Sequence, residues 1–234
     1  MHTPKRNRPI VRVLALACGV VVMGTAASVT PAAVDPQLAA LVASKDRDPA
    51  FVTRDAARHP VEELSFFGLR PDMTVVELWP GGGYWTEILG PYLAKSGHYY
   101  AALPLAKDKE ESEGVKKWRA RIAAHKERIG PVKETLLGPG HYDIAPPGSA
   151  DLVVTFRNLH NWVGDGIAGD VLAGCFRALK PGGILGIEDH RVEPALGEIR
   201  VLGIQLERER QGPVSLPSRL SALRDSSSRF CLSG

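Results

Sequence analysis

The stretch Val75–Leu89, VVELWPGGGYWTEIL, decides the fold of this chain. VVEL is mostly β-branched and apolar, which suits a buried strand, and TEIL with the following PYLA has the apolar spacing of a helix. Three glycines between a strand and a helix permit a tight turn, and they also let backbone N–H groups approach a ligand with no Cβ in the way. Their order, G-G-G after a proline, departs from the G-x-G-x-x-G fingerprint and weighs against NAD. The loop is therefore either a plain tight turn or a ligand-binding loop.

Strands and helices alternate on both sides of this loop. The expected strands are Thr74–Leu78, His98–Leu103, Val132–Leu137, Asp151–Phe156 and Ile184–Glu188. The expected helices between them are Tyr84–Ala94, Asp108–Ile129 and Ile167–Leu179. Such alternation predicts an α/β fold with a doubly wound, mostly parallel sheet, helices on both faces, and ligand sites at the carboxyl ends of the strands.

A helical segment, residues 34–70, precedes the alternating region, residues 71–191. Its expected helices are Pro36–Ser44, Pro49–Arg58 and Val61–Phe67. Four polar side chains of this segment form either a cap over the site or a solvated helix face, namely Arg54, Asp55, Arg58 and His59.

The end of the chain, residues 192–234, fits the alternation worst. Val201–Arg210 is compatible with a strand or a helix, and the last residues are rich in Ser and Arg. We expect an atypical, disordered tail whose terminal strands are missing or divergent, either as a native variation or through a reading-frame change. A sheet that stops there has an exposed edge and favours a homodimer.

Residues 1–33 have the pattern of an export signal. A basic start is followed by the apolar run VLALACGVVVMGTAASV and by small residues. Cleavage predicts a periplasmic or secreted protein with no membrane attachment, and the alternative is an uncleaved membrane anchor. Four of the 29 basic residues lie in this segment. The rest of the chain has 25 basic and 26 acidic residues, so its net charge gives no support for a nucleic-acid partner.

Cysteine and histidine spacing favours neither a disulfide framework nor a metal. Cys175 falls on the apolar face of an expected helix, which favours a buried thiol. His160, Asp189 and His190 lie near strand ends but lack the helical spacing of metal ligands, so we expect no metal site.

Three blocks in order, ELWPGGGYWTEIL, ADLVVTFRNLHNW and ALKPGGILGIEDHR, resemble the Rossmann-like class I S-adenosylmethionine-dependent methyltransferases. More narrowly, the chain is similar to a group of exported bacterial methyltransferase-like proteins. The resemblance covers about Arg47 to Arg191 and implies S-adenosylmethionine as cofactor and a small-molecule methyl acceptor.

The resemblance also implies roles for residues of the glycine loop. Glu77 matches the acid near the methionine amino group of the cofactor, and Gly81 and Gly83 match the glycines whose backbone lies against it. The other residues expected to line the loop are Trp79, Pro80, Gly82 and Tyr84. The alternative for Glu77 is a strand-end acid bonded to a helix N-terminus.

Two departures from the family pattern weaken the cofactor assignment. The second strand, HYYAALPLA, has no carboxylate before Asp108 to hold the ribose hydroxyls. The acid that the family often places after the third strand, near the adenine, is not evident either, because Asp143 lies deep in the following loop. The ribose is then held by backbone or hydroxyl groups, or cofactor binding is weak or lost.

The block Thr155–Trp162, TFRNLHNW, is the second concentration of polar chemistry. In the family this region flanks the transferred methyl group, so Arg157 and Asn158 are expected at the cofactor and His160 and Asn161 at the acceptor as catalytic residues. Histidine titrates near neutral pH, which suits a general base. The alternative is a polar loop held by its own hydrogen bonds.

Three functions remain open from the sequence. The leading hypothesis is methyl transfer from S-adenosylmethionine to an unknown acceptor, and the second is a non-catalytic exported binding protein on the same scaffold. An NAD(P)-dependent oxidoreductase is weaker, because it predicts an acid at the end of the second strand and a Tyr/Lys pair that the sequence lacks.

Overall fold

The structure is a computed structural model that describes residues 34–105, 111–190, 199–205 and 222–225. The expected signal, residues 1–33, lies outside the described residues, and so does most of the expected tail. For the last two described segments the structure gives the course of the backbone only.

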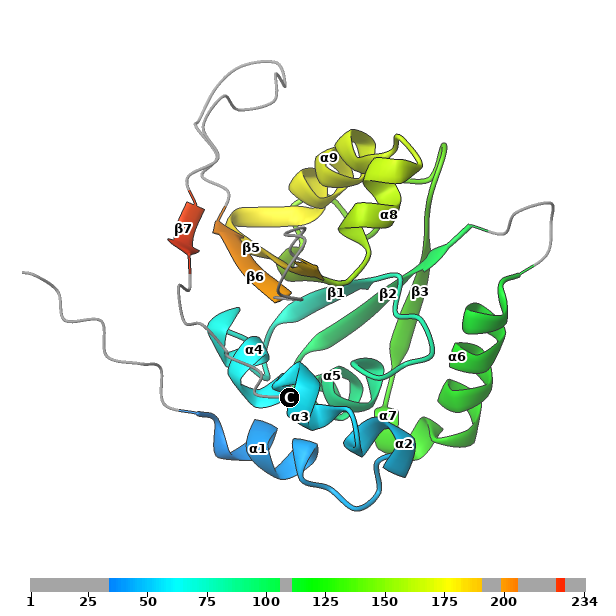
Figure 1. Ribbon diagram of the computed structural model, residues 1–234, viewed down its shortest axis with the longest axis vertical. Coiled ribbons are helices and arrows are strands. Elements are labelled where there is room, and N and C mark those ends of the chain that lie inside the picture. The colour runs from blue at the N-terminus through cyan, green and yellow to red at the C-terminus, as the bar shows by residue number, and fades with distance from the viewer. Residues whose placement is uncertain (1–33, 106–110, 191–198, 206–221, 226–234) are drawn as a thin grey trace, which may run out of the picture. The chain divides into compact units, whose positions relative to one another are not determined.

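In the described part of the chain, seven strands form one sheet in the order β3-β2-β1-β4-β5-β6-β7 (Figure 1). Pairing is parallel from β3 through β5, and β6 and β7 are antiparallel to their neighbours. The strands are β1 (Thr74–Leu78), β2 (His98–Pro104), β3 (Val132–Leu137), β4 (Ala150–Phe156), β5 (Leu179–His190), β6 (Ile199–Gln205) and β7 (Ala222–Asp225). The doubly wound, mostly parallel sheet expected from the sequence is confirmed.

Helices cover both faces of the sheet (Figure 1). On one face are α1 (Pro36–Val42), α2 (Pro49–Val52), α3 (Asp55–Arg58), α4 (Pro60–Phe66), α5 (Thr86–Leu93), α6 (Glu113–Ala124) and α7 (Lys126–Ile129). On the other face are α8 (Leu159–Gly164) and α9 (Ala168–Ala178). None of the helices in the described ranges combines the length and apolar character needed to span a bilayer.

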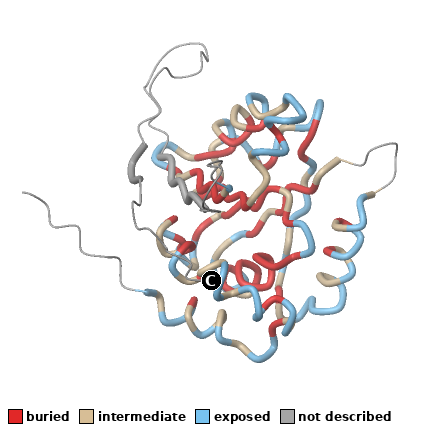
Figure 2. Tube along the Cα trace, in the orientation of Figure 1, coloured by how far each residue is buried: buried red, intermediate tan, exposed pale blue. Residues whose placement is uncertain are grey.

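Each face of the sheet has its own hydrophobic core, because successive residues of a strand point to opposite faces. In β1, Val75 belongs to the core beneath α5, and Val76 belongs to the core beneath α9. Both residues are fully buried, as are the central strands in general (Figure 2). Cys175 of α9 is buried in the second core, as its position on the apolar face of the helix predicts.

The N-terminal helices share the core of the sheet. Leu38, Phe51 and Phe67 belong to the same buried cluster as Trp85. Asp35 caps α1 by accepting from the backbone N–H of Gln37 at 2.7 Å, and it also accepts from the Tyr92 hydroxyl at 2.5 Å. The segment 34–70 is therefore held against the sheet by apolar packing and by hydrogen bonds.

Local structure departs from the expected elements in four places. Strand β5 begins at Leu179, where a helix was expected to end, and not at Ile184. The expected helix Pro49–Arg58 is divided into α2 and α3, and Asp108–Ile129 is divided into α6 and α7 at His125, while residues 106–110 lie outside the described residues. Part of the block Thr155–Trp162 is helical, as the first residues of α8.

The sheet continues beyond β5, where the sequence favoured missing or divergent strands. Strand β6 pairs antiparallel with β5, from Ile184 opposite Gln205 to His190 opposite Ile199. The strand alternative for Val201–Arg210 thus holds as far as Gln205. The remaining residues of the expected tail, apart from β7, lie outside the described residues.

Gly186 of β5 allows a test of the packing between the sheet and α4. A Cβ at this position would lie 2.7 to 2.9 Å from ring atoms of Phe67, so Gly186→Ala should destabilise the fold by about 1 to 3 kcal/mol through overpacking. Gly169→Ala is the matched control, because its added Cβ meets nothing within 4 Å in the first turn of α9, and it should be neutral or stabilising. Urea denaturation measures both, and equal stabilities would contradict the described packing.

Candidate functional site

The glycine loop leaves β1 with an unusual backbone. Trp79, Gly81 and Gly83 have φ values of 50°, 58° and 95°, in the region that favours glycine. A Cβ placed on Gly81 or Gly82 would meet nothing within 4 Å. The exposed side of the loop therefore offers its backbone to open space, which is the condition for close approach of a ligand.

Trp79 takes a positive φ without being glycine, and its side chain explains how this conformation is held. The indole N–H donates to the Leu137 carbonyl at 3.2 Å, and the ring lies edge-on to Trp162 with centroids 5.6 Å apart. Strained backbone of this kind persists where the surroundings fix it, and it is concentrated at functional sites.

Helix α6 supports the loop from behind. The Arg121 guanidinium donates to the Gly82 carbonyl at 3.1 Å and pairs with Glu87 at 2.6 Å. A Cβ on Gly83 would lie 3.1 Å from the Arg121 side chain and 3.3 Å from that of Trp118. Gly83 is thus required for packing against α6, whereas Gly81 and Gly82 face outward.

Glu77 lies near the end of β1 and is 1% exposed. Its Oε2 accepts hydrogen bonds from the Tyr99 hydroxyl and from the Thr86 hydroxyl, the latter at 3.1 Å. Its Oε1 is buried and has no hydrogen-bond partner among the described residues. Burial raises the pKa of Glu77 to about 7, although the two hydroxyl hydrogen bonds oppose the shift.

These contacts bear on both roles considered for Glu77. Thr86 is the first residue of α5, so the carboxylate does bond at a helix N-terminus, through the Thr86 side chain. The unpartnered Oε1 leaves acceptor capacity for a further donor. Contact between Glu77 and a cofactor stays a prediction.

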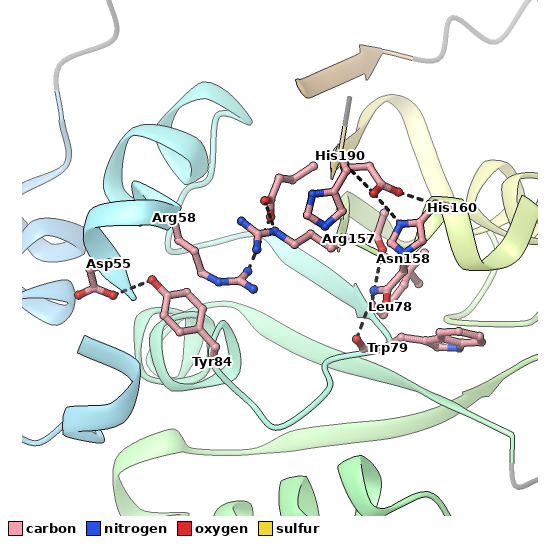
Figure 3. Close-up of polar contacts among 12 residues, drawn as sticks. Asp55, Arg58, Leu78, Trp79, Tyr84, Arg157, Asn158, His160 and His190 are labelled. Atoms are coloured by element: carbon pink, nitrogen blue, oxygen red, sulfur yellow. Dashed lines mark hydrogen bonds and ion pairs between the residues drawn. The ribbon is translucent and has the colours of Figure 1, made fainter. Parts of the chain in front are cut away.

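Tyr84, expected to line the loop, is 4% exposed. Its hydroxyl donates to Asp55 of α3 at 2.6 Å, and burial followed by this hydrogen bond raises the pKa of the phenol. Pro80 is also buried. Tyr84 therefore joins the loop to the N-terminal helices (Figure 3).

Arg157 and Asn158 follow β4 and are held by the ends of the neighbouring strands. Arg157 has φ 61°, and its Nε–H donates to Glu188 of β5 at 2.8 Å. The Asn158 amide donates to the carbonyl oxygens of Leu78 and Trp79 at 3.2 and 3.3 Å (Figure 3). Asn158 thus ties the end of β4 to the glycine loop, and contact of either residue with a cofactor stays a prediction.

His160 lies in the first turn of α8 and pairs with Asp189 at the end of β5 (Figure 3). Its Nδ1 is 2.7 Å from Asp189 Oδ1, and its backbone N–H donates to Oδ2 at 2.9 Å. Burial opposes ionisation of Asp189, but the hydrogen bonds from His160 outweigh it and the pKa of Asp189 is lowered. Asn161 is exposed on the same helix.

The ionised Asp189 can only accept, so Nδ1 of neutral His160 must carry the proton and Nε2 has a lone pair. Half of the His160 side chain is exposed. This is the geometry of a general base oriented by a carboxylate. The sequence pointed to this pair because Asp189 and His190 follow one buried strand and His160 follows another, so all three were expected at the carboxyl edge of the sheet.

A buried charged cluster of Arg58, Glu63, Arg157 and Glu188 was missed by the sequence analysis. Arg58 of α3 lies 3.7 Å from Glu188 Oε2, and the exposed fractions of these two side chains are 11% and 1%. Burial, followed by the neighbouring charge of Glu188, raises the pKa of Glu63 well above its ordinary range. Arg58 and Asp55 therefore lie against the site, which supports the cap interpretation over the solvated face for these two residues.

Two further features of the described residues concern ligand and metal binding. A surface hollow of about 480 Å³ lies behind the loop between α2 and α6, where Phe51, Gly82 and Arg121 line it. No group of three or more histidine, cysteine or acidic side chains gathers in a metal-binding arrangement in the described ranges.

Comparison with known proteins relates this fold to methyltransferases. No protein-family model matches the chain, and no curated protein sequence matches it. Protein-L-isoaspartate O-methyltransferase superposes with a TM-score of 0.51 at 12% identity, over 74% of this chain and 56% of that chain. The likeness shows that the chain has the Rossmann-like fold of these enzymes.

Two further solved structures are similar at lower scores. A SAM-dependent methyltransferase from Aquifex aeolicus has a TM-score of 0.46 and 19% identity, over 71% of this chain and 73% of that chain. An arsenic(III) S-adenosylmethionine methyltransferase from Chlamydomonas reinhardtii has a TM-score of 0.45 and 16% identity, over 67% of this chain and 50% of that chain.

The raised pKa of Glu77 predicts a pH dependence of stability. Between pH 4.5 and 7 the unfolded chain releases this proton while the folded chain keeps it, so stability is lost as pH rises through this window, by about 3 kcal/mol. Glu77→Gln should remove this part of the dependence, measured by urea denaturation at pH 5 and 7. Glu62→Gln, at an exposed acid of α4, is the control, and a Glu77→Gln profile parallel to the wild type would contradict the burial.

The His160–Asp189 pair predicts one tautomer of the imidazole. Nitrogen-15 NMR of the neutral ring should show His160 protonated on Nδ1, and Asp189→Asn should change the tautomer or mix the two forms. His98, an exposed histidine at the start of β2, serves as the internal reference, because its signals should be unaffected. A wild-type ring protonated on Nε2 would contradict the described hydrogen bond.

Proposed function

We propose that this chain binds S-adenosylmethionine against the glycine loop and transfers its methyl group to a small-molecule acceptor. The observation that carries the proposal is the open backbone of Gly81 and Gly82 at the end of β1, in a methyltransferase fold. In open α/β sheets, ligands bind outside the carboxyl ends of the strands where the strand order reverses, and β1 lies at this point between β2 and β4.

The residues present fit the cofactor at the loop. Gly81 and Gly82 leave room for a ligand to lie against the backbone, and Glu77 Oε1 is a buried acceptor that lacks a donor among the described residues. At the end of β2 the chain has Leu103 and Pro104 and no carboxylate, so the ribose would depend on backbone or hydroxyl groups. When bound, the cofactor supplies an electrophilic methyl group on a sulfonium.

The chain's own contribution is positioning and proton transfer. Asn158 and Arg121 hold the loop from two sides, so its backbone is fixed before a ligand arrives. Pre-organisation of this kind lowers the entropic cost of bringing reactants together. His160 Nε2 would take the proton of a hydroxyl or amine acceptor, with Asp189 stabilising the resulting imidazolium.

A second candidate is a non-catalytic, exported binding protein on the same scaffold. The observation that favours it is the absence of a carboxylate on β2, which predicts weak cofactor binding, together with the hydroxyl groups that already engage Glu77. We propose export and homodimer formation with this candidate function as well as with methyl transfer.

Calorimetric titration of the chain with S-adenosylhomocysteine tests the proposal. The wild type should bind, and Gly81→Val should lower the affinity at least about tenfold, because the side chain fills the space over the loop and is strained at φ 58°. Gly148→Val is the matched control, since Gly148 has φ 64° and the same open surroundings but precedes β4 at the opposite edge of the sheet.

Binding that is equal in the wild type and in Gly81→Val would remove the loop from the site. A folded wild type that shows no binding would reject the methyl-transfer proposal and leave the non-catalytic candidate.

A further inference from the structure

Arginines gather around the Tyr84 ring, where the N-terminal helices meet the carboxyl edge of the sheet. The guanidinium carbons of Arg54 and Arg58 each lie 5.0 Å from the ring centroid, and that of Arg47 lies at 5.5 Å. Arg157 joins them from the end of β4, because it shares Glu188 with Arg58 (Figure 3). Arg54 and Arg58 come from the short segment around α3, whereas Arg157 directly follows β4.

The carboxylates of this cluster do not balance its guanidinium groups. Asp55 is occupied by Arg47, which donates to both of its oxygens at 2.6 and 2.9 Å. Glu188 is bonded to Arg157, and its second oxygen has no hydrogen-bond donor closer than Arg58 at 3.7 Å.

Within the described residues, Arg54 has no carboxylate at ion-pair distance, and its guanidinium lies over the Phe51 and Tyr84 rings. The third acid of the cluster, Glu63, is buried and its raised pKa favours the neutral form. Arg47, Arg54, Arg58 and Arg157 therefore outnumber Asp55, Glu63 and Glu188 by one charge, even with Glu63 ionised.

Such an excess is costly to maintain in partly buried surroundings. Burial, followed by the charge of Arg157, lowers the pKa of Arg58, which means that the two guanidinium groups repel each other. Uncompensated charges away from water are stabilised by a counter-ion, and guanidinium groups bind carboxylate and phosphate through paired, directional hydrogen bonds. An anion among these side chains would remove the repulsion.

We propose that Arg54, Arg58 and Arg157 form a subsite for an oxyanion, a carboxylate or phosphate group carried by the methyl acceptor. The assignment to the acceptor rests on the proposed function, whereas the anion site itself rests on the positions and charges of the arginines. The methyl acceptor would then be a small organic anion that also bears a hydroxyl or amine group.

The position of the subsite relative to His160 supports the assignment. Glu188 holds Arg157 and Arg58, and the next residue, Asp189, holds His160. Consecutive side chains of a strand point to opposite faces, so the arginines and the imidazole approach the end of β5 from two sides. An acceptor anchored by its oxyanion at the arginines would therefore extend across the end of β5 to reach His160.

Electrostatics also favours an acceptor anion over a neutral acceptor. A sulfonium is cationic, and unit charges of the same sign a few ångströms apart repel strongly in a medium of low dielectric constant. The oxyanion of the acceptor would offset the charge of the arginines at the place where methyl transfer is proposed.

Titration with inorganic phosphate and, separately, with acetate tests the subsite in the whole chain. Calorimetry at constant ionic strength should show saturable binding to the wild type. Stronger binding of phosphate indicates a phosphorylated acceptor, and stronger binding of acetate indicates a carboxylic acid.

Variants assign the binding to the arginines. Arg54→Met should weaken anion binding about threefold and Arg58→Met about tenfold, because an exposed charge-assisted hydrogen bond contributes less than a partly buried one. Arg54 is exposed and unpaired with any described acid, so its variant keeps the fold even where Arg58→Met does not. Arg70→Met, at an exposed arginine paired with Asp72 outside the cluster, is the control and should bind as the wild type does.

Three results would overturn the proposal. The first is a folded wild type that binds neither anion saturably. The second is binding by Arg54→Met and Arg58→Met that is as tight as binding by the wild type. The third is competition between phosphate and S-adenosylhomocysteine, which would assign the oxyanion to the cofactor. Phosphate binding in a chain that fails to bind S-adenosylhomocysteine would instead reject methyl transfer and keep the anion site.

Discussion

The turn at the end of β1 is the constraint on which the site depends. Strand β1 is hydrogen-bonded on both sides, to β2 and β4, and it is buried on both faces. Its chain must therefore leave the sheet abruptly, and it does so through Trp79, Gly81 and Gly83 at positive φ. Because strand order reverses at this place, the turn also lies where an open α/β sheet binds ligands.

The surroundings of the turn explain why it can hold a strained conformation. The Trp79 indole is bonded to β3, Asn158 reaches the loop from β4, and Arg121 reaches it from α6. Contacts from three separate elements over-determine the backbone, which is how proteins maintain strained residues at functional sites. The loop is held mainly from behind and from the sides, and its outer surface stays open at Gly81 and Gly82.

The N-terminal helices complete the site on its charged side. Tyr84 of the loop donates to Asp55 of α3, and Asp55 in turn holds Arg47. These contacts hold the segment 34–70 against the loop. The same segment contributes to the hydrophobic core and supplies Arg54 and Arg58. The proposed catalytic groups and the proposed anion subsite therefore meet at one edge although they come from distant parts of the sequence.

The strands of the parallel sheet could be predicted because their local patterns agree with the fold. VVEL, DLVVTF and ILGIE are apolar runs of strand length between turn residues, and the described strands contain them. Helix α8 was not predicted, because the polar block after β4 has no apolar period of its own and is ordered by tertiary contacts such as the pair of Asp189 and His160.

The site was predictable in its position but not in its contacts. The glycine loop, Arg157 and His160 do lie at the carboxyl edge of the sheet, as the order of strands and turns predicts. The partners of Glu77 and the burial of Arg58 were not predictable, because Tyr99 and Glu188 approach these side chains only when the strands are aligned. Ion pairs between distant segments leave no periodic signal in the sequence.

A crystal structure of the chain grown with S-adenosylhomocysteine would show whether the glycine loop holds the cofactor. We expect the ligand to lie against the backbone of Gly81 and Gly82, with its amino group directed toward Glu77. Density for the ligand elsewhere on the protein, or a fully formed loop with no ligand at saturating concentration, would contradict this expectation.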